Sequence, residues 1–113
     1  MPESRRLGAD AEDRAADFLM GLGLTIVTRR FKARHGELDL VALDGDRLVF
    51  VEVKERLTGA IPEEAIGRTK IGRLVRAANQ YVADTEQAHR ESRFDVVAID
   101  RDGLRHYRDV LSG

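Results

Sequence analysis

Two acidic residues and one lysine in neighbouring apolar segments have the types and spacing of a metal-dependent site. Asp39 lies in "ELDLVAL" at 37–43, and Glu52 and Lys54 lie in "VFVEVKER" at 49–56. Carboxylate oxygens suit hard cations such as Mg²⁺ and Mn²⁺, and the chain has no cysteine that would bind a softer metal. A lysine beside such a cation could approach a bound water or a phosphate oxygen. The alternative is a cross-strand salt bridge on a solvated face.

The turn between the two segments decides whether these side chains meet. "DG" at 44–45 between apolar runs predicts a β-hairpin. A two-residue loop at 44–45 would place Asp39 opposite Phe50, whereas a four-residue loop at 44–47 would place it opposite Glu52. Because opposite residues share a face, as do residues i and i+2, either loop puts both carboxylates and the lysine on one face. A three-residue loop with a bulge would change this register locally.

The segment that carries Glu52 is expected to be covered on both sides. Val49, Val51 and Val53 alternate with other residues and predict one apolar face, but the opposite face begins with Phe50. Opposite Cβ atoms on paired strands lie ~4.5–5.5 Å apart, and one Mg²⁺ with ligand distances of ~2.0–2.1 Å can bridge that span. For the set of residues on a doubly covered sheet, we therefore favour a cation site over a simple salt bridge.

The rest of the chain supplies the elements that must position these groups. Apolar and β-branched patterns predict four strands and a short fifth, at 24–31, 37–43, 47–55, 93–100 and 104–111. A helix from about Ala9 to Gly21 precedes them, and a longer helix with Thr69 as its N-cap separates the third strand from the fourth. The segment 58–67 is expected to be a loop with one helical turn. The order αβββαβ predicts a mixed α/β domain over residues 1–113, with helices on both faces of one sheet.

Each predicted helix has one apolar stripe that would pack on the sheet. The stripes consist of Ala11, Ala15, Phe18, Leu19 and Leu22 in the first helix, and of Ile71, Leu74, Val75, Ala78, Tyr81 and Val82 in the second. Glu12 lies at the edge of the first stripe, next to Leu19. It is therefore the acidic residue of that helix best placed to face the sheet, although an ordinary boundary glutamate explains the pattern equally well.

Composition narrows the protein class. The chain has 113 residues, of which 42% are hydrophobic and 35% charged, with a formal net charge of -1. No apolar run exceeds four residues, so we expect no membrane-spanning helix, and the start "MPESRR" predicts no secretory signal; a cytoplasmic protein is the expectation. The near-neutral charge argues against tight non-specific DNA binding, but "RRFKARH" at 29–35 and the basic residues of 68–76 form local basic clusters.

The ordered motifs resemble a known family. The acidic residue, the hairpin and the Glu-x-Lys motif resemble the core of the PD-(D/E)XK nuclease superfamily. The whole chain resembles the bacterial YraN family of small predicted endonucleases, and archaeal Holliday-junction resolvases are similar at a greater distance. The matching positions are Gly8 and Glu12, "GELDL" at 36–40, "FVEVKER" at 50–56, Lys70, and "RFDVV" at 93–97.

This resemblance implies a restriction-endonuclease-like fold and metal-dependent phosphodiester hydrolysis. It assigns Asp39 and Glu52 as metal ligands, Lys54 as the catalytic lysine, and Glu12 as a supporting acid. The superfamily's Pro-Asp pair is Leu38-Asp39 here, which is a minor departure.

The resulting hypothesis is a Mg²⁺- or Mn²⁺-dependent endonuclease that acts on DNA, including branched recombination or repair intermediates. The Val53 carbonyl would complete the metal ligands, and Arg56, Lys70 and Arg73 would contact phosphates, unless each is an ordinary surface charge. A homodimer is expected if both strands of a duplex or branched DNA are cut. The alternatives are a non-catalytic nucleic-acid-binding module, or an adaptor domain for a protein partner on the same fold.

Overall fold

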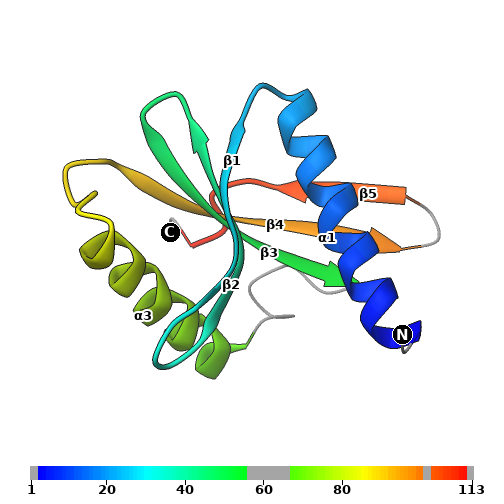
Figure 1. The fold of residues 1–113 in the computed structure, drawn as a ribbon, viewed down its shortest axis with the longest axis horizontal. Coiled ribbons are helices and arrows are strands. Elements are labelled where there is room, and N and C mark those ends of the chain that lie inside the picture. Colours follow the sequence, from blue (N-terminus) through cyan, green and yellow to red (C-terminus); the bar gives the residue numbers. More distant parts are fainter. Residues whose placement is uncertain (1–2, 56–66, 101–102, 112–113) are drawn as a thin grey trace.

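The computed structural model describes residues 3–55, 67–100 and 103–111. Its elements follow the predicted αβββαβ order with a short fifth strand (Figure 1). They are α1 (Glu3–Gly21), β1 (Thr25–Lys32), β2 (Glu37–Asp44), β3 (Arg47–Glu55), α3 (Arg68–Asp84), β4 (Ser92–Asp100) and β5 (Gly103–Tyr107). Among these described residues, no helix is both long and apolar enough to cross a membrane.

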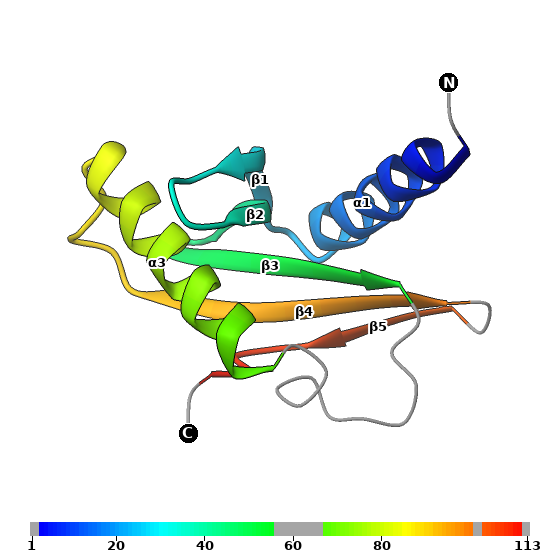
Figure 2. The same ribbon diagram turned by 90° about the horizontal axis from the view of Figure 1, so that it is seen from below.

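The five strands form one mixed sheet in the order β1-β2-β3-β4-β5. Neighbouring strands are antiparallel except β3 and β4, which are parallel, and α3 lies between these two in the sequence. The helices α1 and α3 cover opposite faces of the sheet (Figures 1 and 2). This architecture agrees with the restriction-endonuclease-like fold that the resemblance implied.

The central strand β3 shows how both faces become buried. Val49 and Val51 pack in the cluster that includes the alanines of α1, and Leu48 and Phe50 pack in the cluster of α3. Because successive residues of a strand point to opposite faces, this division follows from the alternation in the sequence. Phe50 is 1% exposed, so the prediction that its face is covered is confirmed.

Several helix details differ from the sequence-based expectations. Helix α1 begins at Glu3 rather than near Ala9, and Leu22 at 55% exposure and Val75 at 38% exposure lie outside the core. Leu22 comes after the last residue of α1, where the helical spacing no longer applies. The buried alanines that the predicted stripes omitted are Ala16 and Ala77.

Thr69 is not the N-cap of α3. The cap position is occupied by Gly67, whose φ is 78°, and no side chain caps the helix. A left-handed φ suits glycine, which lacks a Cβ, so the chain enters the helix through a backbone turn instead of a Thr hydroxyl cap. Thr69 therefore lies inside the first turn. Most of the predicted loop at 58–67 falls outside the described residues.

Strand β5 ends at Tyr107 and not at 111. Asp109 has a φ of 55°, which breaks the extended conformation, and the Val110 N–H then donates to the Phe94 carbonyl at 2.8 Å. The chain thus turns back against β4, and Val110 joins the core beside α3.

Candidate active site

The hairpin places the two predicted metal ligands at adjacent positions. Leu43 pairs with Leu48 and Asp44 with Arg47, so the turn consists of residues 45–46 and the register equals that of the predicted four-residue loop. The β2–β3 ladder runs from this turn to the pair Leu40 and Val51 and stops there. Asp39 and Glu52, the next residues on the two strands, therefore stand at the point where β2 and β3 separate.

A break in side-chain alternation turns Asp39 toward the gap between the strands. Leu38 and Val41 both pack in the cluster of α3 although they are three residues apart, whereas strict alternation would place them on opposite faces. In the gap, Asp39 Oδ2 accepts a hydrogen bond of 2.8 Å from the Val53 backbone N–H. This bond takes the place of a strand pair and fixes the carboxylate beside Glu52.

The proximity of the two carboxylates changes their electrostatics. Glu52 is only 7% exposed. Burial, together with the negative charge of Glu52, raises the pKa of Asp39 to about 7, and the Val53 N–H opposes this rise only in part. Two ionised carboxylates are therefore unfavourable here without a positive charge, which is the electrostatic character of a cation-binding site.

Lys70, in the first turn of α3, supplies a positive charge at this place. Its Nζ lies 2.8 Å from Glu52 Oε1. Burial lowers the pKa of Lys70, but the hydrogen bond and charge of Glu52 and the charge of Asp39 outweigh burial, so the pKa is raised above its ordinary value. Lys54 also contacts the Lys70 side chain. The sequence suggested Lys70 as a phosphate contact. In the structure it lies beside Asp39 and Glu52, and these two acids with Lys54 and Lys70 are named here the carboxylate cluster.

Glu12 lies on the α1 side of the same region. Its side chain faces the sheet, as its position beside the apolar stripe indicated, because it contacts Arg30 of β1, and its charge contributes to the raised pKa of Asp39. Arg30 Nε binds Glu12 Oε1 at 2.6 Å and Oε2 at 3.2 Å. This arginine was not among the predicted site residues, and the run of basic residues at 29–35 contained no signal that distinguished it.

An unusual backbone conformation brings Arg30 to Glu12. Arg29 binds Asp13 of α1 at 2.7 Å, and the next residue of an extended strand should point to the opposite face. Arg30 has a φ of 52°, however, which interrupts the alternation. Both arginines therefore reach α1, and they hold the helix against the strand that lies beside Asp39.

The donor groups fit a hard divalent cation with few protein ligands. No group of three or more His, Cys, Asp or Glu residues with metal-binding geometry exists within the described ranges. Mg²⁺ needs no such group, because it commonly binds one or two carboxylates together with waters and substrate phosphates. A strand residue directs its N–H and C=O toward the same neighbouring strand, so the Val53 carbonyl lies on the side of β3 that faces Asp39. The ammonium of Lys70 on Glu52 shows that a positive charge is accommodated at this position.

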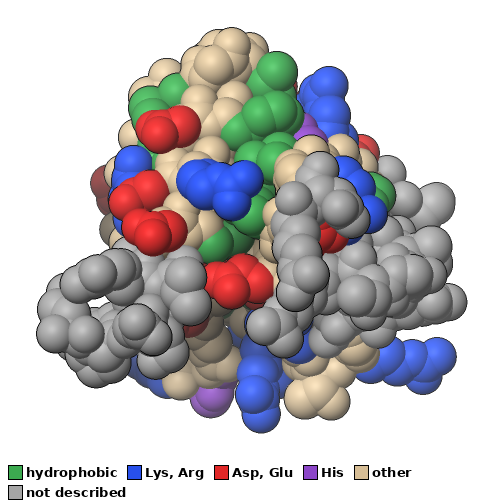
Figure 3. All heavy atoms as spheres, turned by 90° about the vertical axis from the view of Figure 1, so that its right-hand side faces the viewer, with side chains coloured by type: hydrophobic (Ala, Val, Ile, Leu, Met, Phe, Trp, Pro, Cys, Tyr) green, Lys and Arg blue, Asp and Glu red, His purple; other side chains and the backbone are tan. Residues whose placement is uncertain are grey.

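The remaining predicted site residues lie at different distances from the cluster. Arg73 is exposed on α3, one turn beyond Lys70. Arg56 lies outside the described residues. Figure 3 shows the end of the molecule toward which β3 runs, where several acidic side chains lie around a basic one.

The "RFDVV" block on β4 contains a buried network of ion pairs and hydrogen bonds. Arg93 and Asp95 are 4% and 1% exposed, and Arg93 binds Asp95 Oδ1 at 3.0 Å and Asp44 Oδ2 at 2.9 Å. His106 Nε2 and the Asp109 N–H also bind Asp95, at 2.8 and 2.9 Å. Burial raises the pKa of Asp95, but these hydrogen bonds outweigh it and the pKa is lowered. The network joins β5 and the C-terminal segment to β4.

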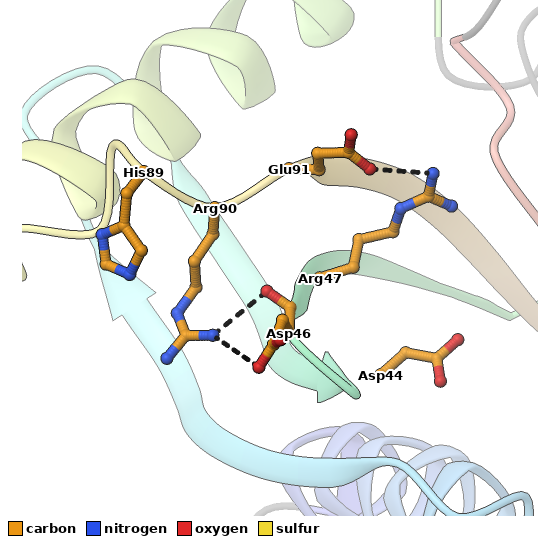
Figure 4. A pocket seen from close by; sticks show the side chains of 6 residues that line it. All are labelled: Asp44, Asp46, Arg47, His89, Arg90 and Glu91. Carbon is orange, nitrogen blue, oxygen red and sulfur yellow. Dashed lines mark hydrogen bonds and ion pairs between the residues drawn. The ribbon is translucent and has the colours of Figure 1, made fainter.

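A hollow at the opposite end of β3 is lined by residues of the β2–β3 turn and of the segment before β4 (Figure 4). Its lining residues are Asp44, Asp46, Arg47, His89, Arg90 and Glu91. Arg90 Nη1 donates to the Asp46 carbonyl at 3.1 Å, and Arg47 pairs with Glu91 at 3.5 Å. Arg90 Nη1 also pairs with the Asp46 carboxylate at 3.7 Å, so both arginines of the hollow are paired with its own acids. The hollow lies apart from the Asp39 and Glu52 carboxylates.

Comparison with known proteins identifies a family whose members match most of the chain. The model of an uncharacterised protein family, UPF0102, matches residues 11–99, a range that includes both carboxylates and both lysines of the cluster. A UPF0102 protein of Rhodococcus jostii is 40% identical over 118 aligned positions, covering 98% of this chain and 100% of the relative. A UPF0102 protein of Beutenbergia cavernae is 46% identical over 95 positions, covering 82% and 80%, and one of Vibrio cholerae is 44% identical over 104 positions, covering 88% and 85%. With its ordered motifs and its fold, the chain belongs to the UPF0102 family, which is the YraN family that its sequence resembles.

Proposed function

We propose that this protein is a Mg²⁺- or Mn²⁺-dependent endonuclease that hydrolyses phosphodiester bonds of DNA. The observation that carries the proposal is the meeting of Asp39 and Glu52 where β2 and β3 separate. Glu52 is buried, Asp39 beside it is half-buried, and the charge of Glu52 raises the pKa of Asp39, which would be unfavourable in a purely structural sheet. The two carboxylates are useful where a divalent cation and a phosphate must bind together.

Asp39, Glu52 and the Val53 carbonyl would hold the cation. When bound, it would polarise the scissile phosphate and lower the pKa of a coordinated water. The Val53 N–H keeps Asp39 oriented at 2.8 Å, so the donor set is preorganised by the central strand. Glu12 supports the set from α1 by its charge, while Arg30 holds it in place.

Lys54 would carry the proton chemistry of the reaction. It lies on the same face of β3 as Glu52, two residues further along, and it contacts the Lys70 side chain. In this position, its ammonium or amine can orient or deprotonate the attacking water and offset the charge that develops on the phosphate. Lys70, which binds Glu52 in the absence of other cations, is a second positive group for the phosphate.

A substrate panel tests this proposal. Labelled single strands, duplexes, four-way junctions and RNA would be incubated with the wild type in Mg²⁺, in Mn²⁺ and in EDTA. We expect metal-dependent cleavage of at least one DNA substrate, abolished by Asp39→Asn and retained by Asp17→Asn, which changes an exposed acid of α1. Binding without cleavage in any metal would favour the non-catalytic nucleic-acid-binding module instead.

A further inference from the structure

In the described part of the chain, some positively charged side chains form ion pairs with carboxylates, and others do not. Within the described ranges, ion pairs involve Arg29, Arg30, Arg47, Lys70, Arg90, Arg93, Arg105 and Arg108. Among the lysines and arginines from residue 10 onward whose side chains the structure describes, those that form no ion pair are Arg14, Lys32, Arg34, Lys54, Arg68, Arg73 and Arg76. Apart from Arg14 and Lys54, all of these lie on α3 or at the tip of the β1–β2 hairpin. The unneutralised charge is thus concentrated on one surface.

The hairpin tip is fixed against α3, so the two elements form one surface. Gly36 packs so closely on the helix that a Cβ there would lie 3.0 Å from the Arg73 carbonyl oxygen. The Arg34 backbone N–H donates to Gln80 Oε1 at 2.9 Å, and the Phe31 ring meets the Tyr81 ring at a centroid distance of 5.1 Å. Figures 1 and 2 both show the connection between β1 and β2 beside α3.

The basic residues of α3 lead from the carboxylate cluster to this tip. Lys70, Arg73 and Arg76 are three residues apart, and residues at this spacing are neighbours on a helix surface. At 1.5 Å per residue, the row spans about 9 Å along the helix. The Arg76 guanidinium lies along the helix next to Gly72, with Nη2 3.8 Å from where a Cβ of residue 72 would be.

We infer that Arg34, Arg73 and Arg76, named here the basic ridge, bind the phosphate backbone of the DNA strand that enters the Asp39 and Glu52 site. Nucleic acid is favoured over an acidic protein because each strand of a duplex carries one phosphate per ~3.4 Å of the duplex axis, so the row of about 9 Å from Lys70 to Arg76 can lie beside two or three of them. Arginine also binds phosphate through a planar fork of donors. This choice of ligand rests on the proposed function.

The test is DNA binding in EDTA, where no metal-dependent cleavage interferes. A fluorescent duplex would be titrated with wild type, with Arg34→Ala/Arg76→Ala, and with the control Arg14→Ala/Arg47→Ala at several salt concentrations. All four side chains are exposed, so both variants should fold. We expect the ridge variant to lose affinity by roughly tenfold for each arginine, and the slope of log affinity against log salt to fall by about two. The control should match the wild type.

Equal affinities and slopes for the two double variants would overturn the inference, and so would a wild type that does not bind DNA. These outcomes are distinct from a failure of the proposed function. If the ridge variant loses binding but the wild type cleaves nothing in Mn²⁺, the ridge stands and the nuclease proposal fails. If the wild type cleaves DNA and the ridge variant binds normally, the nuclease proposal stands and the inference about the ridge fails.

Discussion

Replacing Asp39 by asparagine should stabilise the protein at alkaline pH. The pKa of Asp39 is raised from 3.8 to about 7 by burial and by the charge of Glu52. The folded state therefore holds a proton on this group more tightly than the unfolded state does. The stability from this proton is complete below pH 3.8 and is lost as the pH rises through about 7. Above that pH, the ionised carboxylate destabilises the folded state, and a neutral amide at this position removes the destabilisation.

The size of this effect follows from the pKa change. One pKa unit corresponds to about 1.4 kcal/mol, so the rise from 3.8 to about 7 corresponds to roughly 4 kcal/mol at most. The amide of Asp39→Asn keeps an oxygen for the Val53 N–H, which preserves the 2.8 Å hydrogen bond. We expect a gain of about 2–4 kcal/mol at pH 8.5, which for a domain of this size raises Tm on the order of 10 °C.

The assay is thermal or urea unfolding in EDTA at pH 4 and pH 8.5, because a bound metal would offset the repulsion. The gain should be present at pH 8.5 and small at pH 4. Asp17→Asn, which neutralises an exposed acid of α1, should show no such difference. If Asp39→Asn changes stability equally at both pH values, or destabilises the protein at pH 8.5, the electrostatic account of the carboxylate pair is refuted.

Three further predictions concern metal and chemistry. Glu52→Gln should retain its fold and lose Mn²⁺ binding, and calorimetry that gives the wild-type affinity would contradict its role as a ligand. Lys70→Met should bind Mn²⁺ more tightly than the wild type at pH 8.5, because no ammonium then competes for Glu52 Oε1 at 2.8 Å; an unchanged or weaker affinity would show that the two cations do not compete. Lys54→Ala should slow single-turnover cleavage by ~10²–10⁴ and change the salt slope of binding by no more than about one. Arg73→Ala should instead weaken DNA binding and change the single-turnover rate of bound substrate little, and equal small effects of Lys54→Ala on binding and rate would make Lys54 an ordinary surface lysine.

The local parts of the site could be predicted from the sequence. The alternation in β2 and β3 and the turn at 45–46 are short-range features, and an even-length hairpin loop was enough to bring Asp39 and Glu52 together. The turn itself is shorter than the loop that gave this register, because Gly45 adopts a φ of 62° and lets Asp44 and Arg47 pair.

The long-range parts could not be predicted in the same way. Lys70 reaches Glu52 only because α3 crosses the sheet at one particular position, which no periodicity in the sequence determines. Arg30 reaches Glu12 because of a left-handed φ at a residue type that rarely adopts it. Arg93 and Asp95 lie two residues apart near the start of β4, and they are buried through contacts with Asp44 and with residues of the C-terminal segment.

The most direct test of the nuclease proposal compares two glutamates on the same strand. Glu52 is buried beside Asp39, whereas Glu55 is exposed at the end of β3. Single-turnover cleavage in Mn²⁺ would be measured for the wild type, Glu52→Gln and Glu55→Gln, on the substrate that the wild type cuts best. We predict that Glu52→Gln reduces the rate by at least about 10² and that Glu55→Gln cleaves like the wild type. Cleavage by Glu52→Gln at the wild-type rate would contradict the assignment of this site.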